Sequence, residues 1–393
     1  MRIFTLCMLA LAGVVGWVHI DARPPWAPFA MPAPAPEREH LSAKGKQQAM
    51  VEPQSFFIPE TAAPSVHAAS LIALADGKLR AFWFAGSREG AADVVIQSAV
   101  FDPQASAWSQ PTVVIDRVAA EKGLARYIAK LGNPLPVRAS DGKLHLYFVT
   151  VSVGGWAGSS ISWMESNDDG LSWSRPQRLI TSPALNLSTL IKGPGFDFAD
   201  QSLGLPVYHE WMGKFGELVR IEQGRVMDKR RMSSGRALLQ PIVFIESPET
   251  AVAYFRQARS TGPKRIPSSH TRDAGQSWLI GGDLELSNPN AAIAGLQLAN
   301  GDRIMAINDL EAARHRLVLV MAPAGSDDWS VIEVIESDDV LVNGLHREFS
   351  YPYLTLATSG DVHLVYTYDR KKIKHIQFDA QWLEMKKTQK GAL

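Results

Sequence analysis

The side chains in this sequence that could do chemistry include arginines at the ends of apolar segments. Arg256 follows the apolar segment AYF, while Arg314 and its neighbour Arg316 precede the apolar segment LVL. A guanidinium can hold a carboxylate with two parallel hydrogen bonds, so arginines that converge on one point indicate an acidic ligand. An arginine that ends a core strand needs some partner in any case, so a purely structural role stays open for each of them.

Composition argues against several other kinds of chemistry. The chain has 40 Lys and Arg against 40 Asp and Glu, so it lacks the one-signed field of nucleic-acid binders, and we expect no nucleic-acid partner. The only cysteine, Cys7, lies in an apolar leader, so the rest of the chain can hold no disulfide, thiolate metal site or cysteine nucleophile. No His/Asp cluster has metal-ligand spacing, and we expect neither a metal nor a cofactor.

The elements that must position the arginines recur along the chain. In each copy, an apolar run that starts with a proline or a small residue leads to a glycine turn or similar break, and a second apolar run follows. Successive copies begin about 45 to 70 residues apart, which suits four short strands each and is typical of a β-propeller. The sequence therefore predicts an all-β, six-bladed β-propeller, whereas a β-sandwich would need no regular recurrence. The six copies are Val66 to Phe84, Asn133 to Phe148, Gly193 to Tyr208, Leu239 to Tyr254, Asn288 to Met305 and Tyr351 to Tyr366.

A second motif occurs twice, in SNDDGLSW from Ser166 to Trp173 and in TRDAGQSW from Thr271 to Trp278. Both fit Ser/Thr-x-Asp-x-Gly-x-x-Trp, in which Asp and Ser can bond the turn backbone, Gly supplies positive φ and Trp packs the hairpin against its blade. Degenerate versions end at Trp108 and Trp329. The motif resembles the Asp-box of the sialidase (neuraminidase) superfamily, and several longer segments look like the bacterial predicted neuraminidases. This resemblance implies a six-bladed propeller with the boxes as structural hairpins.

The resemblance also implies a site at the axial mouth of the propeller. Sialidases hold the sugar carboxylate with three arginines and use an Asp acid/base and a Tyr nucleophile activated by a Glu. Carried over by motif, Tyr351 is the nucleophile and Asp93 the acid/base, with Arg88 on the same loop as a substrate contact. Arg256 and Arg314 match two of the carboxylate-binding arginines.

Two positions depart from the sialidase pattern. His67 stands where the first arginine is expected, and the Arg-Ile-Pro segment at residues 265–267 lies just before the second Asp-box, so we interpret it as an outer strand. Gln240 stands where the activating Glu is expected, and a neutral amide cannot act as a base. We keep His67 and Gln240 as substrate contacts, and Glu210 or Glu348 could supply the missing carboxylate.

The N-terminal segment predicts export. A basic start is followed by an apolar run over residues 3–18, between the length of a signal-peptide core and that of a full membrane span. We expect residues 1–22 to be a signal peptide or membrane anchor, 23–54 a Pro/Ala-rich spacer, 55–385 the propeller and 386–393 a tail. A periplasmic location follows, with a possible inner-membrane tether, and the sequence defines no oligomeric state.

Three hypotheses for function fit these residues. The first is a sialidase-like glycoside hydrolase that removes an acidic sugar from a glycan, and the second is a lyase that performs β-elimination on a uronate polysaccharide. The third is a non-catalytic propeller that binds an envelope polysaccharide, which Gln240 favours because it removes the activating base. All three have an acidic glycan or polysaccharide as the partner.

Overall fold

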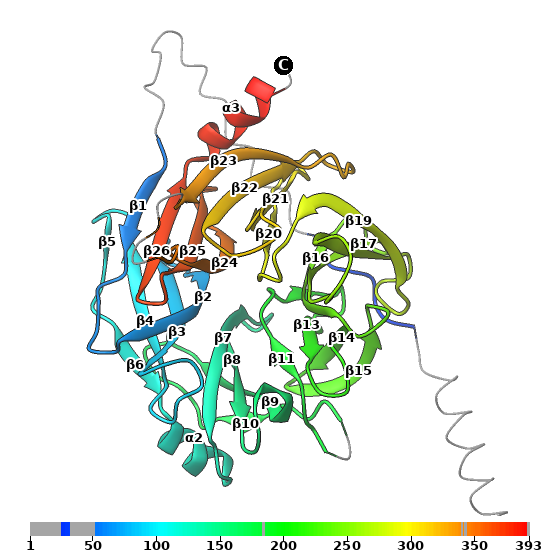
Figure 1. Ribbon diagram of the computed structural model, residues 1–393. Coiled ribbons are helices and arrows are strands. Elements are labelled where there is room, and N and C mark those ends of the chain that lie inside the picture. Colours follow the sequence, from blue (N-terminus) through cyan, green and yellow to red (C-terminus); the bar gives the residue numbers. More distant parts are fainter. Residues whose placement is uncertain (1–24, 32–51, 183–184, 339–340, 342–343, 391–393) are drawn as a thin grey trace, which may run out of the picture.

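The described part of the computed structural model comprises residues 25–31, 52–182, 185–338, 341 and 344–390. These residues form six antiparallel sheets that stand in a ring around a central axis (Figure 1). The predicted six-bladed β-propeller is confirmed. Five of the predicted repeats contribute residues to the first two strands of one blade, and the repeat from Gly193 to Tyr208 covers β12 and most of β13 in blade 3.

The strands of each blade follow one another outward from the axis, with small additions in blades 1 and 3. Blade 1 contains β2 (Ser65–Ala73), β3 (Leu79–Gly86), β4 (Val95–Asp102), β5 (Ala107–Trp108) and β6 (Thr112–Ile115). Blade 2 contains β7 (Lys130–Arg138), β8 (Leu144–Val151), β9 (Ser159–Ser166) and β10 (Gln177–Arg178). Blade 3 contains β11 (Leu190–Ile191), β12 (Phe196–Asp197), β13 (Leu203–His209), β14 (Phe215–Glu222) and β15 (Arg225–Arg231).

The remaining blades have four strands each among the described residues. Blade 4 contains β16 (Leu238–Ile245), β17 (Ala251–Gln257), β18 (Arg265–Thr271) and β19 (Leu279–Ser287). Blade 5 contains β20 (Ala294–Gln297), β21 (Arg303–Ile307), β22 (Arg316–Ala322) and β23 (Ser330–Ser337). Blade 6 contains β24 (Phe349–Leu356), β25 (Val362–Tyr368), β26 (Lys372–Phe378) and, from the other end of the chain, β1 (Gln54–Phe57).

The ring is closed by β1, which pairs antiparallel with β26 from Gln54 opposite Gln377 to Phe57 opposite Lys374. Closure by a strand from the far end of the chain ties blade 6 to the segment that leads into blade 1. We define the mouth as the end of the ring where the inner strands β2, β7, β16 and β24 begin. The hairpin turns that end these inner strands lie on the opposite face.

Two helices accompany the blades within the described residues. The helix α2 (Arg117–Leu124) follows blade 1 and begins at Asp116, whose side chain accepts a hydrogen bond from the backbone N–H of Ala119. The helix α3 (Ala380–Lys390) follows blade 6 and buries Trp382 and Leu383 against it. The predicted tail at 386–393 therefore starts inside this helix. No helix of the described part of the chain is long and apolar enough to cross a membrane, and the predicted anchor at 3–18 lies outside that part.

Residues 25–31 pack on the propeller, although the sequence predicts an extended spacer there. Trp26 and Phe29 are buried, and the Trp26 indole donates a hydrogen bond to Asp228 over 3.1 Å. Backbone hydrogen bonds join Phe29 to Pro248 and Ala30 to Asp197, in turns of blades 4 and 3 that lie opposite the mouth. This segment, which we call the N-terminal clip, fixes the chain to the back of the ring.

The two intact Asp-boxes form the turns after β9 and β18, as predicted for structural hairpins. Ser166 accepts a hydrogen bond from Gly170, which has a φ of 90°, and Asp168 accepts bonds from Ser172. These bonds lower the pKa of Asp168 to about 2. The ring centroids of Trp173 and Phe82, a residue of blade 1, lie 5.8 Å apart. This tryptophan therefore packs against the preceding blade in addition to closing its own hairpin.

Candidate active site

The inner strands of blades 1, 2, 4 and 6 bend at one equivalent position near the mouth. Their pairing with the second strand shifts at this point, which marks a β-bulge that re-aims a side chain. The bulge residues, all with positive φ, are Ala68, Asn133, Gln240 and Tyr351. In three of them the next residue is a proline, which has no N–H to leave unpaired in the interrupted ladder. The recurring proline of the sequence repeat therefore marks the site-forming bulge.

Tyr351 is half-buried at the mouth among residues from several blades. Its hydroxyl accepts a hydrogen bond from Nη1 of Arg256 on β17 over 3.4 Å. Its ring lies 4.3 Å from the ring of His67 on β2, between centroids, at an interplanar angle of 55°. The structure thus brings together three of the predicted site residues from blades 1, 4 and 6.

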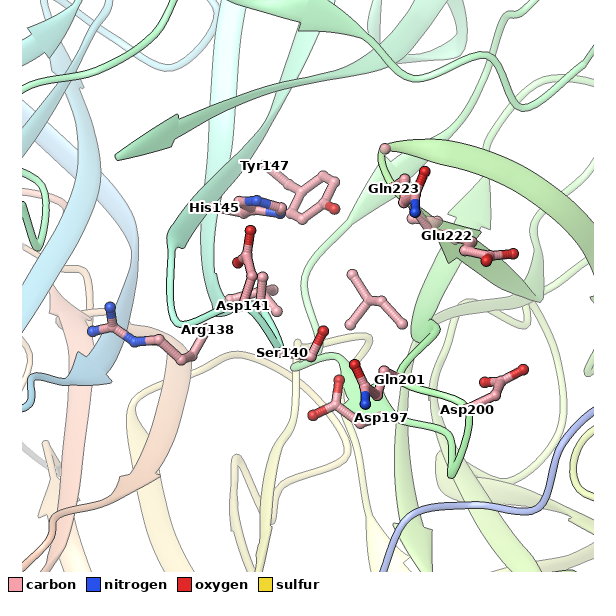
Figure 2. A pocket seen from close by; sticks show the side chains of 15 residues that line it. Arg138, Ser140, Asp141, His145, Tyr147, Asp197, Asp200, Gln201, Glu222 and Gln223 are labelled. Atoms are coloured by element: carbon pink, nitrogen blue, oxygen red, sulfur yellow. The ribbon is translucent and has the colours of Figure 1, made fainter. Parts of the chain in front are cut away.

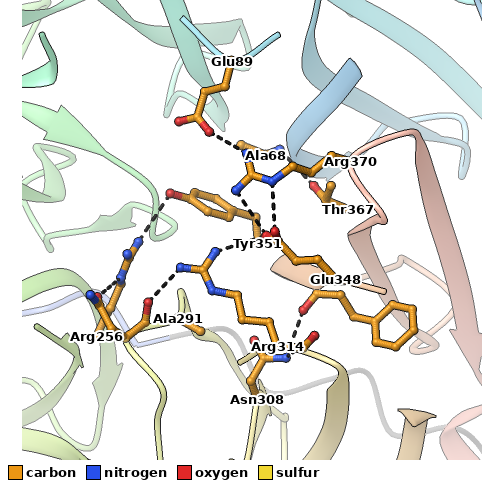
Figure 3. A network of polar contacts seen from close by, with 12 residues as sticks. Ala68, Glu89, Arg256, Ala291, Asn308, Arg314, Glu348, Tyr351, Thr367 and Arg370 are labelled. Carbon is orange, nitrogen blue, oxygen red and sulfur yellow. Dashed lines mark hydrogen bonds and ion pairs between the residues drawn. The ribbon is translucent and has the colours of Figure 1, made fainter. Parts of the chain in front are cut away.

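Arginines surround this tyrosine. Figure 3 shows the guanidinium groups of Arg256, Arg314 and Arg370 on different sides of the Tyr351 side chain. Arg256 also donates to the side-chain oxygen of Asn290 over 2.7 Å, and Arg314, just before β22, donates to the backbone oxygen of Asn290 over 2.9 Å. Two arginines predicted from the sequence therefore converge, and Arg370, in the turn after β25, joins them.

Glu348, just before β24, connects Arg314 with Arg370. Its Oε1 accepts from Arg314 over 3.2 Å and its Oε2 accepts from Arg370 over 2.9 Å. Burial opposes ionisation of Glu348, but hydrogen bonds from Arg370 and the charges of both arginines lower its pKa to about 2. Arg370 also donates to Glu89, on the loop between β3 and β4, over 2.8 Å. Because these arginines already engage Glu348, it is not free to serve as the base for Tyr351.

His67 is buried with neither ring nitrogen bonded to any described residue. Burial, reinforced by the positive charge of Arg370, lowers its pKa to about 3, so the imidazole is neutral at pH 7. An unpaired buried polar group costs about 1–3 kcal/mol, which a ligand or water that bonds the ring could recover. The residue at the predicted arginine position is thus a neutral group with free hydrogen-bonding capacity.

Gln240 is held by partners at both ends of its amide. Its oxygen accepts from Arg256 over 3.2 Å, and its nitrogen donates to the hydroxyl of Tyr208 over 3.3 Å. Asn133, at the equivalent bulge of blade 2, donates to the same hydroxyl over 3.3 Å. Burial raises the pKa of Tyr208 far above its usual range, and the charges of Tyr351 and, after it, Glu210 raise it further. Glu210 itself is half-buried, and its backbone N–H donates to Ser188 over 2.9 Å.

Lys192, which no sequence motif indicates, lies buried behind Tyr351, with its Nζ 6.0 Å from the centroid of the tyrosine ring. Its Nζ donates to the backbone oxygen of Pro352 over 2.9 Å and lies 5.1 Å from the centroid of the Tyr353 ring. Burial lowers the pKa of Lys192 to about 7. The next residue, Gly193, comes so close to the carbonyl of Pro241 that an added Cβ would lie 2.4 Å from its oxygen. This close approach admits only glycine and keeps blades 3 and 4 together beside the lysine.

Arg88 and Asp93 lie on the exposed loop between β3 and β4, which also carries Glu89. Both oxygens of Asp93 accept hydrogen bonds from Ser87, at 2.9 Å each, and these bonds lower its pKa. Among the described residues, no contact joins Asp93 or Arg88 to Tyr351. The loop is therefore placed at the mouth, but these two predicted residues stand apart from the group around Tyr351.

A separate cavity of about 380 Å³ opens between blades 2 and 3 on the face opposite the mouth (Figure 2). Asp141, Asp197, Asp200 and Glu222 give it an acidic lining, so it is unsuited to a carboxylate ligand. No group of three or more His, Cys, Asp or Glu side chains in the described part of the chain is arranged to hold a metal ion.

The sequence matches the family of BNR repeat-like domains over residues 77–364, which is well over half of the chain. The chain belongs to this family. The BNR repeat-like protein is also similar in fold to solved sialidases. The search of curated proteins found no significant match to it.

Solved structures similar to the BNR repeat-like protein share its fold at low identity. The Hadza microbial sialidase Hz136 is 14% identical, with a TM-score of 0.66 over 83% of this chain and 68% of its own. A protein of unknown function from Dyadobacter fermentans is 11% identical, with a TM-score of 0.67 over 82% and 97%. The intramolecular trans-sialidase from Ruminococcus gnavus, solved with oseltamivir carboxylate, is 13% identical, with a TM-score of 0.63 over 84% and 97%.

Proposed function

We propose that this protein is an exported sialidase-like glycoside hydrolase that removes a terminal acidic sugar from a glycan. The observation that carries the proposal is the grouping of Arg256, Arg314 and Arg370 around the phenol of Tyr351 (Figure 3). Convergent guanidinium groups suit a carboxylate, and a phenol is a nucleophile that a neighbouring carboxylate does not repel. The similar structures named as a sialidase and a trans-sialidase support the same class of substrate.

In the proposed reaction, the arginines hold the sugar carboxylate beside the anomeric carbon. The oxygen of Tyr351 attacks that carbon, the glycosidic bond breaks, and an acid gives a proton to the leaving oxygen. Water then attacks the same carbon and releases the sugar from the tyrosine. The acidic group must lie at the anomeric carbon, as in a 2-keto sugar acid, for the arginines and the phenol to act together.

Activation of the phenol rests on positive charge in this proposal. Arg256 lies 3.4 Å from the Tyr351 oxygen, where its charge stabilises the phenolate that develops as the proton leaves. Gln240 cannot take that proton, because its amide nitrogen donates to Tyr208 and its oxygen accepts from Arg256. Glu210, the carboxylate selected from the sequence, is our proposed acceptor; no contact between described residues joins it to Tyr351, so the proposal has the proton reach it through water.

Asp93 stays the proposed acid/base from the sequence motif. Its bonds to Ser87 favour the ionised form, so donation of a proton requires the loop between β3 and β4 to change its contacts when substrate binds. Asp93→Asn should then slow turnover of substrates with poor leaving groups far more than of an aryl glycoside, because an aryl oxide leaves without protonation. Equal losses on both substrates would contradict this assignment.

A second candidate, β-elimination on a uronate polysaccharide, is favoured by the neutral imidazole of His67 beside Tyr351. In that reaction a base removes the C5 proton, the arginines neutralise the carboxylate and the bond at C4 breaks. The product contains a conjugated double bond that absorbs in the ultraviolet, whereas the product of hydrolysis does not. A glycan-binding protein without turnover is the third candidate, favoured by Gln240.

The test is turnover of a panel of sialosides, related nonulosonate glycosides and uronate oligosaccharides by the purified chain. We expect hydrolysis, with Tyr351→Phe lowering kcat at least ~10³-fold while binding is kept. Tyr127→Phe is the matched control because Tyr127 is 64% exposed on the exterior, and it should leave kcat unchanged. A fully active Tyr351→Phe would refute the nucleophile, and an ultraviolet-absorbing product would establish the lyase.

We also propose that the protein is exported to the periplasm and anchored through the apolar run at 3–18. Fractionation of cells that express the full chain tests this: we expect the protein with the membrane fraction, and in the soluble periplasm when a cleavable signal peptide replaces residues 1–22. Recovery of the full chain in the cytosol would refute it.

A further inference from the structure

The site lacks an arginine at position 67 yet places a guanidinium nearby from another blade. Arg370 lies in the turn between β25 and β26, and its backbone oxygen accepts a hydrogen bond over 2.9 Å from Val66, the residue before His67. The side chain of Thr367 on β25 accepts from the N–H of Ala68 over 3.2 Å, on the other side of His67. The end of blade 6 is thus fixed against the part of β2 that carries His67.

The guanidinium of Arg370 is held in place without using all of its donors. Its Nε and Nη2 donate to Glu348 over 2.9 Å and 3.3 Å, and its Nη1 donates to Glu89 over 2.8 Å. A guanidinium carries five N–H donors, so these contacts with described residues leave two for another partner. The side chain is 39% exposed, which leaves it open to a ligand at the mouth.

The charges of this group also match one acidic ligand. Arg314 and Arg370 pair with Glu348, Arg370 also pairs with Glu89, and Arg256 lies at the Tyr351 hydroxyl. These five described residues together carry one net positive charge. A monoanionic carboxylate would neutralise it. An arginine at position 67 would add a buried cation next to Arg370, whereas the neutral His67 adds none.

We propose that Arg370 is a substrate-binding residue that supplies the third guanidinium of the carboxylate site, from blade 6 instead of blade 1, with neutral His67 beside it. This inference rests on the proposed function, because it assumes an acidic sugar at Tyr351. Two expectations follow that would not hold if Arg370 had only a structural role. Arg370 should distinguish the acid from its ester, and the positive charge should be movable between positions 370 and 67.

The test is a charge exchange measured by calorimetric binding of two probes, N-acetylneuraminic acid and its methyl ester. The wild-type chain should bind the acid about 10-fold to 100-fold more tightly than the ester, as expected for charge-assisted contacts. Arg370→Glu should lower the affinity for the acid at least ~10-fold and leave the ester nearly unaffected. Lys371→Glu, which makes the same charge change one residue away on a side chain that is 70% exposed, should change it less than about twofold.

His67→Arg alone should also weaken binding of the acid, because the new cation lies against Arg370. The double variant, His67→Arg with Arg370→Gln, keeps one net positive charge at the site and moves the guanidinium from position 370 to position 67. It should recover the affinity to within about threefold of wild type, since Glu348 would then be free to hold the guanidinium introduced at position 67. Thermal unfolding of each variant shows whether it is folded. If His67→Arg does not fold, the single variants Arg370→Lys and Arg370→Gln take its place in the test. Arg370→Lys should lose part of the preference for the acid over the ester, and Arg370→Gln should lose all of it.

The outcomes separate this inference from the proposed function. A wild-type chain without preference for the acid over the ester would refute the acidic-sugar proposal itself. A wild-type chain with that preference, kept by Arg370→Glu or by Arg370→Gln, would refute only the role of Arg370. A double variant as weak as the product of its two single variants would likewise refute the exchange of charges.

Discussion

Removal of the Glu348 carboxylate should unlock the arginines at the mouth and destabilise the fold. Glu348→Gln keeps the shape of the side chain but leaves Arg314 and Arg370 without the charge that they share. Glu348 is 28% exposed and Arg314 is 20% exposed, so solvent screens this network only in part. We therefore expect the loss to exceed that of a surface ion pair.

The pKa of Glu348 gives the size of the effect. A pKa of about 2 in the folded chain, against 4.5 for the unconstrained side chain, corresponds to roughly 3 kcal/mol at neutral pH. Partial exposure of Arg370 reduces this, and we expect about 2 kcal/mol. Because the folded pKa is the lower one, the contribution is complete above pH 4.5 and disappears as the pH falls towards 2.

Urea unfolding of wild type and Glu348→Gln at a series of pH values measures this contribution. The difference in unfolding free energy should be about 2 kcal/mol at pH 7 and should shrink steadily between pH 4.5 and pH 2. Glu60→Gln is the control, since Glu60 is 62% exposed in its pair with Lys372 and should contribute at most about 0.5 kcal/mol. A difference that does not vary with pH, or one below about 0.5 kcal/mol at pH 7, would refute the network.

Two further predictions concern buried side chains. The pKa of Lys192 is about 7 in place of 10.5, so the unfolded chain binds more protons than the folded one and the unfolding free energy of wild type should rise between pH 7 and pH 10. Lys192→Met should remove that rise when urea unfolding is measured at each pH. A pH profile that Lys192→Met leaves unchanged would contradict the burial of this amine. Trp26→Ala should lower the free energy of unfolding, measured by calorimetry, by about 3 kcal/mol, because it empties a buried position and breaks the hydrogen bond to Asp228. Trp211→Ala is the control: the residue is 46% exposed, and its replacement should lower that free energy by under about 1 kcal/mol. Equal losses for the two tryptophans would show that the N-terminal clip is not docked.

The fold could be predicted because its signals are local. The positive φ of a turn glycine such as Gly77 or Gly170 is a requirement of a single hairpin. The same requirement recurs in the first hairpin of four blades, at Gly77, Gly142, Gly301 and Gly360. Closure of the ring by β1 leaves no such trace, since it depends on pairing with β26 at the other end of the chain. The Pro/Ala-rich composition predicts an extended spacer at the N-terminal clip. The segment packs on the propeller because Trp26 and Phe29 are buried there.

The site could be predicted in part for the same reason. Tyr351, Arg256 and Arg314 stand at fixed places relative to their repeats, so the motif found them, and the structure brings them together. No motif indicates Arg370 or Lys192, because their positions depend on contacts between blades. Such contacts join residues that have no regular separation along the sequence. A sequence signal for Arg370 did exist: the absence of an arginine at 67 implies that another cation must be found.

The N-terminal clip lies on the face of the propeller opposite the mouth. It fastens the chain to blades 3 and 4 on the side away from Tyr351, so whatever holds residues 1–24 holds the propeller by its back. Under the proposed anchoring through residues 3–18, the mouth with Tyr351 would therefore face away from the membrane. The proposed substrate would then be a glycan in the surrounding medium.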